Sequence, residues 1–172
     1  YSTITDINDM SKWSQHDGAF ITKSDRKGFP AIRIESTIGT IPMVKFQSGS
    51  QLNLSRYLLF KMFIEDKSSL VQTDLVLLSS SGQILFRRYL VTSNMGTNPR
   101  PFFDKNDLCR FEVDLESFET IVTGSTLSDV TGIGIRLYRV AGKTPVIWLG
   151  EIKSASFRPC VTLRFDDARA SI

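Results

Sequence analysis

Hydrophobic and polar residues alternate along most of this chain, and a period of two is the pattern of a β-strand rather than of a helix. In residues 57–64 every second side chain from Leu58 to Ile64 is apolar, which predicts a strand with one buried face. The same pattern predicts strands at further segments, namely residues 30–35, 43–47, 73–78, 83–92, 110–115 and 132–140, with one more inside 144–157.

The two last strands carry large polar and aromatic side chains on the face opposite to their apolar positions. Arg136 and Tyr138 lie opposite to the inward face of residues 132–140, and Trp148 lies opposite to its two neighbours. Because successive side chains of a strand point to opposite faces, these residues are predicted to point away from the core.

The strands are short and are separated by segments rich in Gly, Ser, Asn and Asp, of which 79–82 is a turn by composition. The helical candidates, 115–119 and 127–130, are only about one turn long. This spacing is typical of sandwiches. The predicted fold class is therefore all-β, an antiparallel β-sandwich of jelly-roll type.

Two segments interrupt this pattern. Residues 93–107 form a long loop with two prolines and an adjacent pair of phenylalanines, and loops of that length are usually functional or disordered. After Pro159 a new apolar strand begins, and proline suits a linker or the first residue of a strand. We predict one domain over 1–157, and in 158–172 a linker and the first strand of a second, truncated domain.

Composition excludes several classes of function. The chain has 172 residues, 41% of them hydrophobic and 23% charged, with a net charge of +3, which is ordinary for a globular protein and too weak to indicate nucleic-acid binding. No apolar run is long enough for a membrane span. With His16 as its one histidine and no phosphate-binding loop, the chain alone is not expected to be a complete enzyme. Cys109 and Cys160 allow one disulfide, and the sequence leaves open whether it forms.

Four strand patterns together resemble the jelly-roll carbohydrate-binding modules of the galactose-binding-like superfamily. They are residues 54–61, 110–115, 132–135 and 147–152. The resemblance implies a polysaccharide partner. It also implies a structural calcium near the N-terminal strands, for which the oxygen ligands would be Asp6, Asn8, Asp9 and Glu35, although no Asp-x-Asp-x-Asp-Gly loop is present.

Sugars are bound by aromatic faces and by polar groups that contact hydroxyls. Each candidate has the alternative reading of a packing or solvated side chain, since half of all strand residues point outward. The carbohydrate-binding candidates are Lys61, Arg88, Arg136, Tyr138 and Trp148 on the strands and Arg100, Phe102 and Phe103 in the long loop.

Residues 161–167, with sequence VTLRFDD, resemble the first motif of polysaccharide deacetylases, which fold as a distorted (β/α) barrel. The resemblance implies that Asp166 is a general base and that Asp167 binds zinc or a similar divalent metal. Ala168 stands where the family usually has glycine, and the family's downstream histidine ligands are not in this sequence. Two adjacent carboxylates after a strand also occur as a solvated turn.

These observations predict a non-catalytic module that binds or positions glycan for a metal-dependent deacetylase of bacterial surface polysaccharide. The expected location is extracellular, at the cell surface or on a virion, and a homo-oligomer is left open. One alternative is a structural or interaction sandwich of a phage tail or cell-surface assembly without a sugar site. Another is a lyase or glycosidase using Lys61, Arg136 and Tyr138, which requires these three to share a face.

Overall fold

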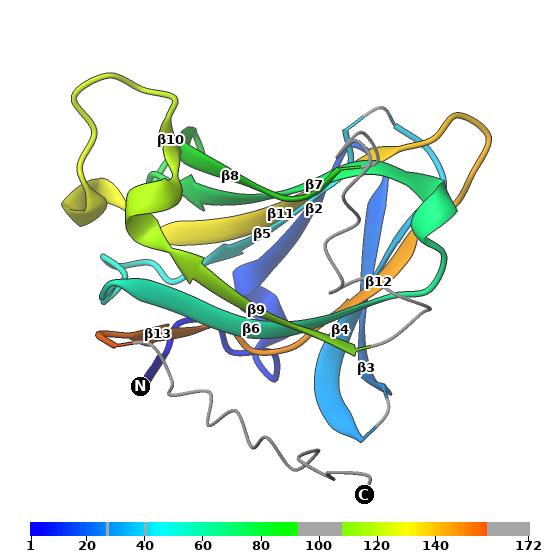
Figure 1. Cartoon of the computed structure of the whole chain (residues 1–172), viewed down its shortest axis with the longest axis horizontal. Helices are drawn as coiled ribbons and strands as arrows, with labels where there is room; N and C mark the ends of the chain where they lie inside the picture. The colour runs from blue at the N-terminus through cyan, green and yellow to red at the C-terminus, as the bar shows by residue number, and fades with distance from the viewer. Residues whose placement is uncertain (27, 40, 93–107, 158–172) are drawn as a thin grey trace, which may run out of the picture.

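The structure is a computed structural model that describes residues 1–26, 28–39, 41–92 and 108–157. In this part of the chain, two antiparallel sheets are stacked face to face and no α-helix is present (Figure 1). The predicted fold class, an all-β sandwich, is confirmed.

The first sheet is built around β6 and is called here the β6 sheet. Along its main path the strand order is β1, β13, β6, β12, β4, β3, and β9 pairs with the other edge of β6. Its seven described strands are β1 (Ser2–Thr3), β3 (Ala19–Arg26), β4 (Phe29–Ser36), β6 (Tyr57–Ile64), β9 (Leu108–Asp114), β12 (Val146–Leu149) and β13 (Lys153–Ala155).

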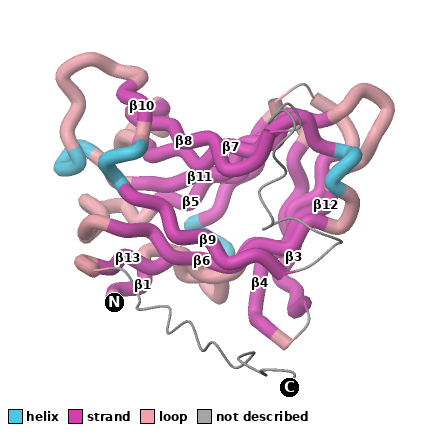
Figure 2. Tube along the Cα trace, in the orientation of Figure 1, coloured by secondary structure: helices cyan, strands magenta, loops and turns pink. Residues whose placement is uncertain are grey.

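The second sheet is built around β7 and β11 and is called the β7 sheet. Its strand order is β10, β8, β7, β11, β5, β2, and it forms the upper layer in Figure 2. Its six described strands are β2 (Trp13–His16), β5 (Met43–Gln47), β7 (Leu70–Leu78), β8 (Ile84–Thr92), β10 (Glu119–Thr120) and β11 (Gly132–Arg139).

Short 3₁₀ turns lie at the strand ends. Two of them, η4 and η5, fall within the segments that the sequence predicted as single helical turns. The four that are described are η1 (Met10–Lys12), η2 (Lys67–Ser69), η4 (Leu115–Ser117) and η5 (Leu127–Asp129).

The main core lies between the sheets and is filled by alternate residues of both. The predicted apolar face of β6, from Leu58 to Ile64, lies in it, and so do Ile133, Ile135 and Leu137 of β11. Their alternation fixes which side chains point outward, because each strand residue next to a core residue points to the other face of its sheet.

Two parts of the fold differ from the strands predicted. The strand expected within residues 144–157 is split into β12 and β13, which both pair with the same edge of β6. The strands β2 and β3 were not predicted. The reason is their exposure: β3 alternates poorly in polarity, and most of β2 is exposed, so the buried-face pattern is weak there.

Candidate functional site

The outer face of the β7 sheet carries a row of polar and aromatic side chains that crosses the strands. Asp74 of β7 is the register partner of Arg136 on β11 and of Tyr89 on β8, so these three side chains share one row. In the next row, Gln72 of β7 is paired with Tyr138 of β11. We call this set, with Arg87 of β8, the tyrosine–arginine face; it comprises Gln72, Asp74, Arg87, Tyr89, Arg136 and Tyr138.

Asp74 lies at the centre of the tyrosine–arginine face and is fully buried. Its Oδ2 accepts a hydrogen bond from Arg136 Nη2 at 2.6 Å, and its Oδ1 accepts one from Gln72 Nε2 at 2.7 Å. A buried carboxylate is tolerated only when it is paired and hydrogen-bonded in this way. Asp74 therefore fixes the positions of Arg136 and Gln72, whose side chains are more accessible to solvent.

Each arginine of the face lies beside a tyrosine two residues along the same strand. The Arg136 guanidinium carbon is 5.4 Å from the ring centroid of Tyr138, and that of Arg87 is 4.8 Å from the ring of Tyr89. Burial, followed by the nearby Asp74 carboxylate, raises the pKa of Tyr138, so its hydroxyl stays protonated and can donate. Tyr89 is 40% exposed. Two aromatic rings are thus held at the surface between oriented hydrogen-bond donors.

The remaining charge of the face is largely neutralised. Arg87 Nη2 and Glu119 Oε2 of β10 form an ion pair at 2.5 Å, and their hydrogen bond raises the pKa of Arg87. Together with the Asp74–Arg136 pair, this leaves the face with no net charge from these four groups.

Two glycines of β11, Gly132 and Gly134, leave no room for a side chain in the neighbouring part of the sheet. A Cβ on Gly132 would lie 2.5 Å from Gln47 Oε1, because the side chain of Gln47 lies directly over it. Gln47 Nε2 and Lys45 Nζ then donate to the carbonyls of Ser79 and Gly82 in the β7–β8 turn, each at 3.1 Å. These two long side chains are therefore held against the sheet.

The sequence placed Arg136 and Tyr138 on one outward face, and the structure brings them together. On β8 the residue of this face is Arg87, because it pairs with outward-facing Val76, whereas the candidate Arg88 pairs with Leu75 of the core. Arg88 reaches the edge of the sandwich, where its Nη1 donates to the carbonyl of Ser117 at 3.4 Å.

Lys61 and Trp148 lie on the outer face of the other sheet. Lys61 alternates with the core residues of β6 and is the partner of Arg110 across β9. Trp148 is only 6% exposed and belongs to a second hydrophobic cluster. The set required for a lyase or glycosidase is therefore not assembled, because Lys61 and the pair Arg136 and Tyr138 point to opposite sides of the sandwich.

Several further predictions lie outside the described residues. These are Arg100, Phe102 and Phe103 of the long loop, the pair Asp166 and Asp167, and Cys160 of the disulfide. The calcium stays a prediction too. In the described part of the chain no three His, Cys, Asp or Glu side chains gather to hold a metal ion. Asp9 accepts from Ser11, and Glu35 pairs with Arg33.

Asp74, Gln72, Arg87 and Tyr89 were not among the residues predicted from the sequence. One signal could have found Asp74, since it is the single charge inside the otherwise apolar run of 73–78. Its partners could not have been found in this way, because only the pairing of β7 with β8 and β11 places them beside it.

Comparisons with known proteins identify the fold. No family model and no curated protein matches the chain. Among solved structures, it is similar to the family 11 carbohydrate-binding module from Clostridium thermocellum in complex with a β-1,3-1,4-mixed-linked tetrasaccharide. The TM-score is 0.57 at 12% identity, over 88% of this chain and 92% of that one.

Two more solved structures have the same architecture. The family 11 module of a cellulosomal cellulase of Clostridium thermocellum matches with a TM-score of 0.52 at 12% identity, over 82% of this chain and 85% of that one. An exo-β-agarase matches with 0.59 at 9% identity, over 87% of this chain and 24% of that one. At these identities the likeness establishes a β-sandwich of the kind found in carbohydrate-binding modules.

Proposed function

We propose that this chain is a non-catalytic module that binds a neutral glycan on the tyrosine–arginine face. The observation that carries the proposal is the buried Asp74 carboxylate, which holds Arg136 and Gln72 in place beside two surface tyrosines. A binding surface gains affinity when its polar groups are ordered before the ligand arrives.

The chemistry of the face matches that of a sugar. A tyrosine ring offers an apolar surface to the C–H side of a pyranose, and its edge and hydroxyl remain polar. The remaining N–H groups of Arg136 and Gln72 supply donors for sugar hydroxyls around that surface, and the Tyr138 oxygen supplies an acceptor. The ion pairs Asp74–Arg136 and Arg87–Glu119 cancel the charge of the face, which favours an uncharged ligand.

The structural relatives support this assignment of class. The family 11 module is described in complex with a mixed-linked tetrasaccharide, and an agarase contains a similar sandwich. By the same comparison we propose a polysaccharide partner and a place of action outside the cytoplasm. No helix in the described ranges has the length and apolarity required to cross a membrane.

The test is a binding titration with neutral oligosaccharides of mixed β-linkage. Replacing Tyr138 or Tyr89 by Ala is expected to weaken binding about two- to twelvefold each, since one aromatic contact contributes roughly 0.5–1.5 kcal/mol. Tyr1→Ala is the matched control. Tyr1 is 68% exposed and directly precedes β1, which pairs with β13 in the β6 sheet, away from the tyrosine–arginine face. If all three variants bind the oligosaccharides with the same dissociation constant as the wild type, the site does not lie on the tyrosine–arginine face.

The association with a deacetylase is also part of the proposal. It rests on the resemblance of residues 161–167 to the first deacetylase motif, with Asp166 as base and Asp167 as metal ligand. The parent coding sequence tests it: a His-x-x-x-His motif within roughly a hundred residues downstream supports a barrel of that family. If the reading frame ends soon after Ile172, the deacetylase assignment is wrong.

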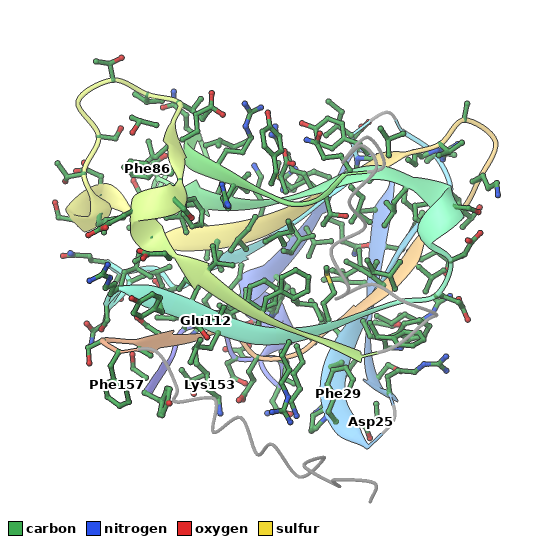
Figure 3. All side chains as sticks on the ribbon, viewed as in Figure 1. Asp25, Phe29, Phe86, Glu112, Lys153 and Phe157 are labelled. Atoms are coloured by element: carbon green, nitrogen blue, oxygen red, sulfur yellow. The ribbon has the colours of Figure 1, made fainter. Side chains whose placement is uncertain are left out.

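One observation favours a second candidate, an interaction module. The rings of Tyr1 and Phe157 lie 5.8 Å apart, and both are more than half exposed. Figure 3 places Phe157 beside the N-terminal end of the chain, below the β6 sheet. Exposed aromatic groups of this kind mark contact surfaces. Analytical ultracentrifugation of the wild type and of the Tyr1→Ser, Phe157→Ser double variant tests this role. If the wild type associates and the double variant associates to the same extent, the pair of rings is not the contact surface.

A further inference from the structure

A second hydrophobic cluster lies outside the core, on the outer face of the β6 sheet. Its members alternate with core residues of β4, β6 and β12, so they point away from the sandwich interior. Trp148 of β12 lies in one row between its register partners Arg33 of β4 and Phe63 of β6. The cluster consists of Phe29, Ala31, Phe63, Val146 and Trp148.

Arg26, near the end of β3, covers this cluster. Its guanidinium carbon lies 4.5 Å from the ring centroid of Phe63 and 4.6 Å from that of Trp148. The β3–β4 hairpin projects at one end of the β6 sheet, and Figure 3 shows Asp25 and Phe29 near the tip of this hairpin. A guanidinium can stack on aromatic rings through its face and donate from N–H groups that lie in its plane.

Two nitrogen donors at this cluster find no hydrogen-bond acceptor among the residues that the structure describes. The Nε1 of Trp148 and the Nε of Arg26 are both buried and unpartnered, and the tryptophan is 94% buried as a residue. Buried donors are nearly always paired, so two orphans side by side require an explanation. The other tryptophan of the chain shows the usual case, since Trp13 Nε1 donates to the carbonyl of Asp6 at 2.9 Å.

Two arginines lie over the aromatic rings of the cluster. Arg33 lies 5.7 Å from the Trp148 ring and is paired with Glu35 on its own strand. Arg26 adds a second guanidinium, and its neighbour Asp25 points to the opposite side of β3 by strand alternation. Two unsatisfied donors beside a cationic group match an acceptor that carries negative charge.

We propose that Arg26 and Trp148 form a second binding site, which accepts the oxyanion of an acidic saccharide, either a uronate carboxylate or a sulfate ester. The site lies on the opposite sheet from the tyrosine–arginine face and does not rest on glycan binding there. The oxyanion accepts from Arg26 Nε and Trp148 Nε1, and the flexible arginine side chain shifts to admit it.

The two indole N–H resonances of the chain provide the test. In a ¹⁵N-labelled sample the Trp148 resonance, assigned from Trp148→Phe, is expected to shift saturably with glucuronate or with a sulfated monosaccharide. The resonance of Trp13 is the internal control and stays in place. Glucose is the neutral probe, and comparison of the two acidic probes identifies the preferred oxyanion.

Arg26→Ala should weaken the acidic probe about tenfold or more, because a hydrogen bond to a charged group is removed. Arg26→Lys keeps the charge and should recover only part of the affinity, since it lacks Nε and the planar stack. Arg56→Ala is the matched control, because Arg56 also lies over a tyrosine ring, with 5.4 Å to the centroid of Tyr57, and belongs to neither proposed site.

The proposal is overturned if the Trp148 resonance does not shift, if glucose shifts it equally, or if Arg26→Ala leaves the titration unchanged. The circular dichroism spectrum of Arg26→Lys is compared with that of the wild type to check that the variant is folded. Neutral-glycan binding at Tyr89 and Tyr138 is measured separately. If no neutral glycan binds there, the proposed function is refuted, but the proposal of a second site at Arg26 and Trp148 is not affected.

Discussion

The ion pair between Asp74 and Arg136 makes a sharp stability prediction. The carboxylate is fully buried and the arginine side chain is 14% exposed, with 2.6 Å between Oδ2 and Nη2. Replacing Arg136 by Met retains the apolar stem and removes the charge. Asp74 is then left as a buried anion that still accepts a hydrogen bond from the amide of Gln72 but has lost its cationic partner.

The expected magnitude follows from the burial. Breaking one partner of a buried pair destabilises a protein by about 3–5 kcal/mol, because an uncompensated charge remains in a medium of low polarity. The reverse variant, Asp74→Leu, is expected to be milder, at about 1–3 kcal/mol, since the more exposed arginine can reach water. The double variant removes both charges and is expected to lie close to the wild type.

Urea denaturation of the four proteins, followed by circular dichroism, completes a double-mutant cycle. Because the double variant is expected to lie close to the wild type, the coupling energy equals the sum of the two single losses, about 4–8 kcal/mol in favour of the pair. Equal values of the denaturant slope would show that the denatured states are comparable. If Arg136→Met costs less than about 1 kcal/mol, Asp74 is not held as a buried charge, and the account of how the tyrosine–arginine face is ordered is wrong.

Two further predictions concern a glycine at the start of β11 and the η5 turn that precedes this strand. Gly132→Ala would place a Cβ 2.6 Å from the carbonyl oxygen of Phe46, so we expect about 1–3 kcal/mol of destabilisation by urea denaturation; an unchanged midpoint would contradict this geometry. Hydrogen bonds from Thr126 lower the pKa of Asp129 below its usual value. Its contribution to stability is therefore present above the pKa of an unfolded aspartate and is lost as the pH falls through the lower folded-state value. Asp129→Asn should lower the urea midpoint at neutral pH, and the two proteins should converge in strong acid; a constant difference across pH would refute the cap.

The strands that bury one face were predictable because their pattern is local. Leu58 to Ile64 and Ile133 to Leu137 alternate so regularly that their inward faces follow from the sequence, and both lie in the core. The outward direction of Trp148, Arg136 and Tyr138 followed from the same argument. Strand β3 escaped prediction because it is an edge strand with mostly half-buried and exposed residues.

The composition of the site was less predictable, because alternation tells inside from outside but not one sheet from the other. Trp148 and Tyr138 are equally outward in sequence, yet they lie on opposite faces of the molecule. The sequence does not separate Arg87 from Arg88 as the residue of this face, because the register of β7 with β8 shifts at two irregularities, between Thr73 and Asp74 and between Leu77 and Leu78. Such shifts depend on the partner strand and leave no mark in the local pattern.

The position of β6 also constrains how the chain folds during its synthesis. One edge of β6 is filled by β12 and β13, which are made about 80 residues after it, and β1 pairs with β13 from the far end of the domain. At roughly 5–20 residues per second, the ribosome takes several seconds to deliver these strands. During that interval, the edge of β6 that β12 and β13 will fill and the edge of β4 that β12 will fill have no partner strand. The sandwich thus closes only once residue 155 has emerged, and the nascent chain needs protection from aggregation until then.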